Sequence, residues 1–163
     1  MKNLRPLILL SFWLSVTFTN AQNSYSFQET TDAYTELTGA TVIKSTDFNS
    51  GGFYNLPVTN EVYKLYDVRF KFGGILTFAV QPNGNIRIDN DSSLIIIDAA
   101  FTFLDSIDNT SQISYKIEGT SGNQIVKVQW KNFKIRDGAA NNFLNFQIWI
   151  HQKSGVIENR YGA

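Results

Sequence analysis

Very few side chains in this sequence could carry out catalysis. The 163-residue chain has one histidine, His151, and no cysteine. A serine triad would have to use His151, while cysteine nucleophiles and ordinary zinc frameworks of cysteine and histidine are excluded. The G-x-S-x-G turn that presents a nucleophilic serine is also absent. We therefore predict no catalytic residues and interpret His151 as a solvated strand histidine.

Carboxylates are more numerous, and two of them across a cleft could hydrolyse a glycosidic bond. The available groups are Asp67, Asp89, Asp91, Asp98, Glu118 and Glu158. Most of them alternate to the outer face of predicted strands, where charge keeps a sheet soluble. We expect Asp98 to end a strand or to accept a backbone hydrogen bond. A secreted hydrolase is therefore a disfavoured alternative. The oxygen-rich stretch 89–93 lacks the glycine and glutamate of a calcium loop, so no metal and no cofactor are predicted.

Two tryptophans lie on predicted neighbouring strands but on different faces. In IVKVQWKNF (residues 125–133), Trp130 shares a face with Val126 and Val128 and is predicted to be in the core. In LNFQIWIHQK (residues 144–153), Trp149 alternates away from the apolar residues. Trp149 is therefore predicted to point outward.

The outward face of that second strand carries the one plausible recognition site. Gln147, Trp149 and His151 share it. An indole can pack against the C–H face of a sugar while amides bond its hydroxyls. These three residues are therefore the predicted ligand-binding residues. Two alternatives are that a loop covers Trp149, or that it packs against another outward aromatic residue.

The elements that position these residues are predicted to be strands throughout. Aromatic residues are abundant, with 13 Phe and 7 Tyr, and β-branched residues recur. Residues 93–104 are apolar on both faces, which predicts a central strand, and Asn83-Gly84 predicts a type I′ hairpin. Alternation of apolar and polar residues predicts further strands at 62–72, 76–80, 86–88, 113–117, 125–133, 143–151 and 156–161. Short strands at this spacing indicate an all-β protein, an antiparallel β-sandwich of jelly-roll or immunoglobulin-like type without substantial helix.

The first 21 residues have the order of a secretory signal peptide. Lys2 and Arg5 precede an apolar stretch from Leu7 to Phe18, which is shorter than the roughly 20 residues of a membrane helix. Thr19 and Ala21 supply small residues before a cut after Ala21. We therefore predict a signal peptide at 1–21 and a single β-sandwich domain at 22–163, without a membrane span in the mature chain.

Charge and cysteine content restrict the partners and the compartment. Removal of Lys2 and Arg5 leaves twelve basic against 14 acidic residues, a net charge of about −2. Such a balance offers no electrostatic footprint for nucleic acid. An exported chain without cysteine is not built on disulfides, which favours a bacterial envelope or extracellular product.

Four segments in a familiar order give the chain a family resemblance. They are YSFQETTDAYTELTGATVI, FAVQPNGNIRI, GTSGNQIVKVQWKNFKI and NFQIWIHQKSGVIENRYG. Together they resemble an N-terminal β-sandwich module of Bacteroidetes exported proteins, many of which end in a type IX secretion sorting domain. The resemblance implies a fold and an exported location, but no catalytic residues.

The sequence departs from that resemblance after the RYG segment. No sorting domain follows, so the chain is either a truncated frame of a larger surface protein or a stand-alone module that reaches only the periplasm. We expect a secreted or cell-surface module that binds a glycan or a cell-surface protein. The alternative is a structural spacer without a ligand.

Overall fold

The computed structural model describes residues 26–45, 48, 52–56, 62–65, 68–71, 77–90, 93–98, 104–106, 110–135 and 143–162. The chain divides into two compact units, Met1–Asp32 and Ala33–Ala163. The predicted signal peptide lies outside the described residues, and residues 26–32 carry no helix or strand. In the part of the chain that is described, no helix is long and apolar enough to cross a membrane. The architecture below is that of the second unit.

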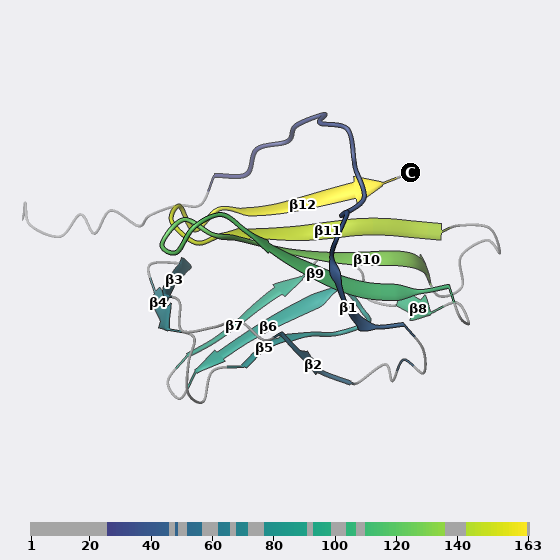
Figure 1. Cartoon of the computed structure of the whole chain (residues 1–163), viewed down its shortest axis with the longest axis horizontal. Helices are drawn as coiled ribbons and strands as arrows, with labels where there is room; N and C mark the ends of the chain where they lie inside the picture. Colours follow the sequence, from purple (N-terminus) through teal and green to yellow (C-terminus); the bar gives the residue numbers. More distant parts are fainter. Residues whose placement is uncertain are drawn as a thin grey trace, which may run out of the picture. The chain divides into compact units, whose positions relative to one another are not determined.

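The larger sheet, sheet A, is antiparallel and contains the longest strands. Its order is β1-β9-β10-β11-β12, and β8 pairs with the end of β10 (Figure 1). Apolar residues that alternate with polar ones, as in β9 to β12, favour strands of which one face is buried. The six strands of sheet A are Thr41–Lys44 (β1), Leu104–Ser106 (β8), Gln112–Glu118 (β9), Ile125–Ile135 (β10), Phe143–His151 (β11) and Ile157–Gly162 (β12).

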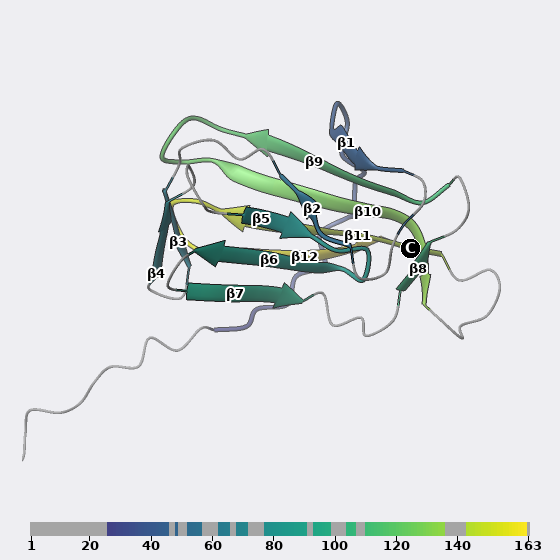
Figure 2. The same ribbon diagram turned by 90° about the horizontal axis from the view of Figure 1, so that it is seen from below.

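The smaller sheet, sheet B, has the order β2-β5-β6-β7 and is also antiparallel. Its strands are Tyr54–Asn55 (β2), Thr77–Val80 (β5), Asn85–Asn90 (β6) and Ser93–Asp98 (β7). Figure 2 shows β5, β6 and β7 side by side in front of sheet A. A separate pair is formed by Val62–Leu65 (β3) and Val68–Lys71 (β4).

Two predicted strands differ from those observed. The run 62–72 is not one strand, because β3 and β4 pair with each other and Leu65 lies opposite Val68. The first part of the apolar run 93–104 is not a central strand, because it is β7, at the edge of sheet B. Residues 99–103 lie outside the described residues, so the expectation that Asp98 ends a strand stays a prediction. Isoleucine on both faces of β7 therefore reflects an exposed position, Ile96, beside a buried one, Ile97.

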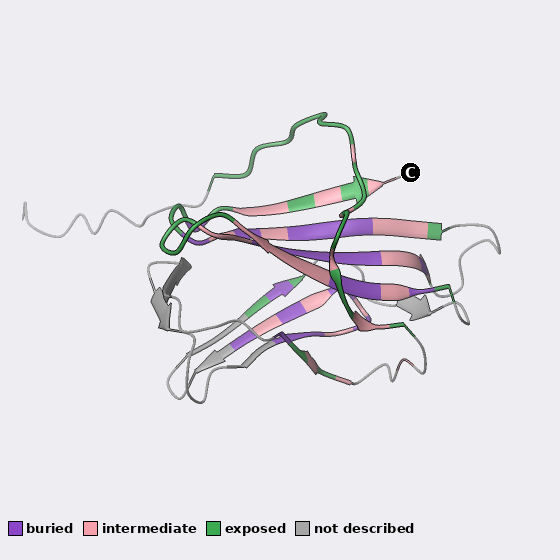
Figure 3. Cartoon of the chain, viewed as in Figure 1, coloured by how far each residue is buried: buried purple, intermediate pink, exposed green. Residues whose placement is uncertain are grey.

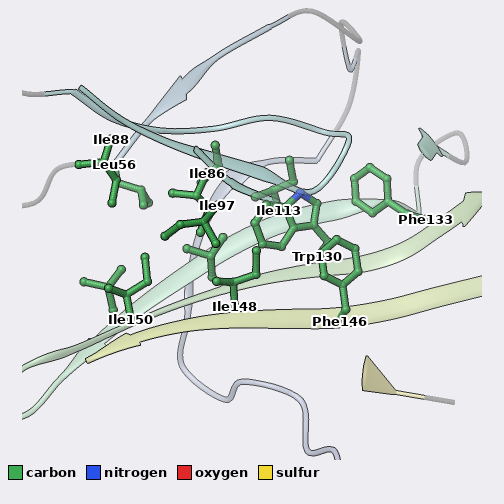
Figure 4. Packing of buried hydrophobic residues seen from close by; sticks show 13 residues of the cluster. Leu56, Ile86, Ile88, Ile97, Ile113, Trp130, Phe133, Phe146, Ile148 and Ile150 are labelled. Atoms are coloured by element: carbon green, nitrogen blue, oxygen red, sulfur yellow. The ribbon is translucent and has the colours of Figure 1, made fainter. Parts of the chain in front are cut away.

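The two sheets bury one hydrophobic core between them, which confirms the predicted all-β sandwich (Figure 4). Sheet A contributes alternate residues of its long strands, and sheet B contributes those of β5, β6 and β7. The buried members are Leu56, Val80, Ile86, Ile88, Ile97, Ile113, Val126, Val128, Trp130, Phe133, Phe146, Ile148 and Ile150. Burial of such apolar surface is the main favourable term in folding.

Trp130 lies in this core, as its alternation on β10 predicts. Its side chain is 0% exposed and stacks on Phe146, with ring centroids 4.8 Å apart and planes 6° from parallel. Its Nε1 donates a hydrogen bond to the Gln81 carbonyl oxygen at 2.8 Å. Because Gln81 follows β5, this bond ties sheet A to the hairpin of sheet B.

The β5–β6 hairpin is present as predicted, but its turn is of another type. A type I′ turn needs positive φ at both Asn83 and Gly84, whereas only Gly84 has it, at 88°. Gly84 N–H donates to the Gln81 carbonyl at 3.2 Å, which makes Pro82 the second residue of the turn. Proline fixes φ near −65°, so the chain adopts a type I turn followed by a left-handed glycine.

A bulge in β10 changes the strand that β10 pairs with. Residues up to Lys131 pair with β9, and those from Phe133 pair with β8. Asn132 between them has φ 55°, a left-handed conformation that asparagine tolerates. Its N–H donates to Asn145 Oδ1 at 2.8 Å, and its carbonyl accepts from Ser111 Oγ at 2.6 Å. These bonds satisfy the backbone groups that the bulge removes from the ladder.

Candidate binding surface on sheet A

Sheet A has a second face, turned away from the core, and it carries the predicted ligand-binding residues. This outer face alternates with the buried positions of β9 to β12. At the end of the sheet near the β11–β12 turn it holds Lys116, Glu118, Lys127, Trp149, His151, Glu158 and Arg160. Figure 3 shows that β10 and β11 are largely buried, whereas β12 is half-buried to exposed.

Two glutamines form the centre of the outer face. Gln129 on β10 lies opposite Gln147 on β11, and they are only 3% and 1% exposed. The Gln147 Nε2 donates to Gln129 Oε1 at 2.9 Å and to the Thr35 carbonyl at 2.8 Å. Leu37 N–H donates to the same Gln129 oxygen at 2.8 Å. Both buried amides are therefore bonded, as buried polar groups must be.

The backbone partners of these amides belong to residues 34–37, which we call the cover segment. In Figure 1 the part of the second unit that precedes β1, from residue 33, runs across β9, β10, β11 and β12. Lys131 Nζ holds the segment through Glu36 Oε2 at 2.7 Å. The Tyr34 ring packs directly against Gly162, where a Cβ atom would lie only 2.7 Å from the ring. Burial raises the pKa of the Tyr34 hydroxyl, and the Glu36 charge adds to that rise.

Trp149 stands beside the covered glutamines and is half-buried. Its Nε1 donates to Gln147 Oε1 at 2.7 Å. Lys127 Nζ lies 3.8 Å from the ring centroid and the Arg160 guanidinium carbon 3.9 Å from it. Lys127 belongs to β10 and Arg160 to β12, the strands on either side of β11, so the two cations approach the indole from opposite sides. Both faces of the indole are therefore occupied by cation–π contacts.

Each cation on the indole has a carboxylate partner. Glu118 accepts from Lys127 at 2.5 Å and from Lys116 at 2.8 Å. Glu158 accepts from Arg160 at 2.9 Å and lies 2.5 Å from His151 Nε2. A continuous row of opposite charges thus crosses four strands with the indole at its centre. We call these seven side chains, from Lys116 to Arg160 as named above, the charged row.

The charged row perturbs the acid-base behaviour of one carboxylate. The Lys116 and Lys127 ammonium groups, through hydrogen bonds and charge, lower the pKa of Glu118 from 4.5 to about 2. The Glu118 side chain is 38% exposed, so solvent screening limits the pair to the contribution of a surface ion pair, about 0.2–1 kcal/mol. The lysines thus keep Glu118 ionised in acid, where an unpaired glutamate would be protonated.

This pKa shift predicts a defined acid dependence of stability. A lowered native pKa means that the unfolded chain binds more protons between about pH 4.5 and pH 2. The stabilisation by Glu118 should therefore be complete above about pH 4.5 and lost as the pH falls to about 2. Urea unfolding over this range should show a shallower decline for Glu118→Gln than for the parent chain. Parallel declines in the two proteins would show that Glu118 does not carry the effect.

The structure brings the three predicted residues together on one face of β11, but in different surroundings. Gln147 is buried beneath the cover segment, with both of its amide hydrogens in use. Trp149 is half-buried between two cations, and His151 is paired with Glu158. A sugar that stacks on Trp149 would have to replace Lys127 or Arg160 on the ring.

Sequence reasoning missed the residues that surround Trp149. Lys127 is opposite Trp149 on β10, and Arg160 is diagonal to it on β12. The alternation of each strand places both cations on the outer face, but their alignment with the indole needs the strand register. The cover segment carried no sequence signal, because residues 34–37 form no strand.

Comparison with known proteins identifies the family. No curated protein and no solved structure matches the chain significantly. A family model described as NIDO related matches residues 24–163. This match spans the whole of sheets A and B, including every residue of the charged row. The chain therefore belongs to the NIDO-related family.

Proposed function

We propose that this domain is an extracellular, non-catalytic binding or adhesion module whose ligand contacts the charged row at Trp149. Membership of the NIDO-related family supports an extracellular β-rich module. The resemblance to exported Bacteroidetes modules supports a secreted or cell-surface location, or the periplasm if type IX export does not apply. The site-level support is a half-buried indole clamped between two cations.

The chemistry of the charged row favours an acidic glycan among the possible ligands. A neutral sugar gains the indole face only by breaking a cation–π contact. A uronic acid or sulfated sugar carries an anionic group, and Lys127 or Arg160 can leave the indole to bind it. The C–H face of the sugar then packs on the indole face that the cation has left. A charge-assisted hydrogen bond to Arg160 offsets part of the lost cation–π energy, about 0.5–2 kcal/mol.

A structural spacer is the second candidate, and one observation favours it. The charged row is already satisfied within the chain, because Glu118 and Glu158 each pair with two basic side chains. Such a row stabilises four strands without any ligand. A hydrolase has less support. His151 is held by Glu158 at 2.5 Å, and no oxygen nucleophile is positioned beside it in the contacts described above.

Glycan binding by defined variants tests the proposal. The purified chain is run in native gels that contain a soluble polyuronate or a neutral glucan, at low and high salt. We expect retardation by the polyuronate that weakens with salt, since screening reduces charge attraction. Trp149→Ala should abolish it, whereas Trp149→Phe, which keeps the aromatic face, should retain most of it.

Two controls make the result interpretable. Lys153→Ala removes an exposed cation from the β11–β12 turn, outside the charged row, and should bind as the parent does. Far-ultraviolet circular dichroism must show that each variant keeps the parent's fold. Absence of retardation on both polysaccharides, with the fold intact, would reject the glycan proposal and leave a protein partner or the structural spacer.

A further inference from the structure

β12, the last strand of sheet A, is an edge strand with features that favour pairing with another strand. β12 closes the strand order on one side and β1 closes it on the other. β1 has four residues and a register irregularity between Val42 and Lys44, which blunts that edge. β12 has six residues, and its register against β11 is regular from Ile157 to Gly162. A regular edge strand is a template for another strand.

The hydrogen-bond phase of β12 follows from the turn that precedes it. His151 N–H donates to the Val156 carbonyl at 3.0 Å, so residues 151 and 156 form a hydrogen-bonded pair. Such pairs alternate with non-bonded ones along an antiparallel ladder. Glu158 and Arg160 therefore direct their peptide groups toward β11. The peptide groups of Ile157 and Asn159 point away from β11, toward the edge.

The side chains of β12 are self-complementary about Asn159. The sequence Ile-Glu-Asn-Arg-Tyr places an acid and a base symmetrically around the asparagine, with an apolar residue beyond each. If a second copy runs antiparallel with Asn159 opposite Asn159, Glu158 lies opposite Arg160 of the second copy. Ile157 then lies opposite Tyr161 of the second copy. No other centre within β12 pairs both the charges and the apolar residues.

We propose that two copies of this chain associate through β12, with a two-fold axis at Asn159, so that sheet A continues across the dimer. The hydrogen-bond phase of β12 and the order of its side chains both favour Asn159 as the centre of the pairing. The outward peptide groups of Asn159 meet those of the second copy as a hydrogen-bonded pair. Glu158 and Arg160 then fall in a non-bonded pair, where opposite side chains lie closer.

The charges already present on β12 are compatible with this pairing. Glu158 and Arg160 bond to each other within one chain at 2.9 Å. Across the axis the same two groups would form an alternating square with their copies, so that each carboxylate faces two guanidinium groups. Asn159 and Tyr161 are exposed in the single chain, although they lie on the face of β12 that continues the core. Pairing would cover part of that exposed surface.

Disulfide trapping locates the interface, because the chain has no cysteine of its own. Opposite residues of a hydrogen-bonded pair have Cα atoms about 5.5 Å apart, within the range that a disulfide spans. Asn159→Cys should therefore form a disulfide-linked dimer readily under mild oxidation. Lys153→Cys, in the exposed β11–β12 turn, is the matched control and should remain largely monomeric.

Sedimentation of the parent chain over a wide concentration range supplies the second measurement. We expect the mass to double as concentration rises. Asn159→Pro should prevent this, because it removes an edge N–H without touching a β11–β12 bond, whereas Asn159→Ala should not. Glu158→Lys and Arg160→Glu should each fail to self-associate but should form a mixed dimer, since the mixture restores opposite charges.

The outcomes separate clearly. A monomer at every concentration overturns the proposal, as does a dimer that Asn159→Cys does not trap, because that dimer uses another surface. Trapping at Asn159 with rescue in the mixed dimer supports it. Asn159 and Lys153 lie outside the charged row, so their variants test association independently of glycan binding.

Discussion

Replacing Trp130 with alanine should cost this domain about 3–5 kcal/mol of unfolding free energy, the range for an aromatic residue deleted from a core. The side chain is fully buried and stacked on Phe146. Its loss leaves a cavity where the two sheets meet and removes the bond to the Gln81 carbonyl. Small domains have about 5–15 kcal/mol in total, so the variant should be marginally folded. Urea unfolding followed by circular dichroism measures the difference.

Trp130→Phe separates the two contributions of this residue. It keeps a ring against Phe146 but cannot donate to Gln81. The Gln81 carbonyl still accepts from Gly84 N–H, so it is not left without a donor. We therefore expect a clearly smaller loss than for alanine. A Trp130→Ala loss below about 1 kcal/mol, as for a surface position, would contradict the packing described here.

The fold class followed from the sequence because alternation survives wherever one face of a strand is buried. β9, β10 and β11 are long, and each places alternate apolar residues in or against the core, so their faces were assigned correctly, including the core position of Trp130. β7 was misplaced because its isoleucines on both faces suggested a covered strand. An edge strand with only one buried face can have the same run of isoleucines as a strand covered on both faces. The β3–β4 hairpin was missed because alternation continues through its turn.

The candidate surface was predictable only in part, for a different physical reason. Which residues share a face of one strand depends on local geometry, and Gln147, Trp149 and His151 do share one. Which residues meet across strands depends on register and on segments distant in sequence. Lys127 and Arg160 reach Trp149 through register. The cover segment reaches Gln147 from 112 positions away.

The cover segment provides the second large expected effect, through Gln147. Gln147→Met keeps the length and much of the volume of the side chain but removes every hydrogen bond it makes. The Thr35 carbonyl and Trp149 N–H would lose their described partner. An unsatisfied buried group costs about 1–3 kcal/mol. We expect a loss in unfolding free energy of about that size or larger, measured by urea unfolding.

Hydrogen exchange distinguishes local release of the cover segment from a general loss of stability. Leu37 N–H is bonded to Gln129 Oε1, and that oxygen is also held by Gln147. In Gln147→Met the Leu37 amide should exchange faster by more than the fall in global stability explains, because the segment opens separately. Gln112→Met, at a half-buried position on β9, should leave both quantities near the parent values. If Leu37 exchange changes only with global stability, the segment is part of the cooperative core. In that case Gln147 buries its amide to fix the cover segment on sheet A, and within the described residues a ligand would have the charged row to rearrange.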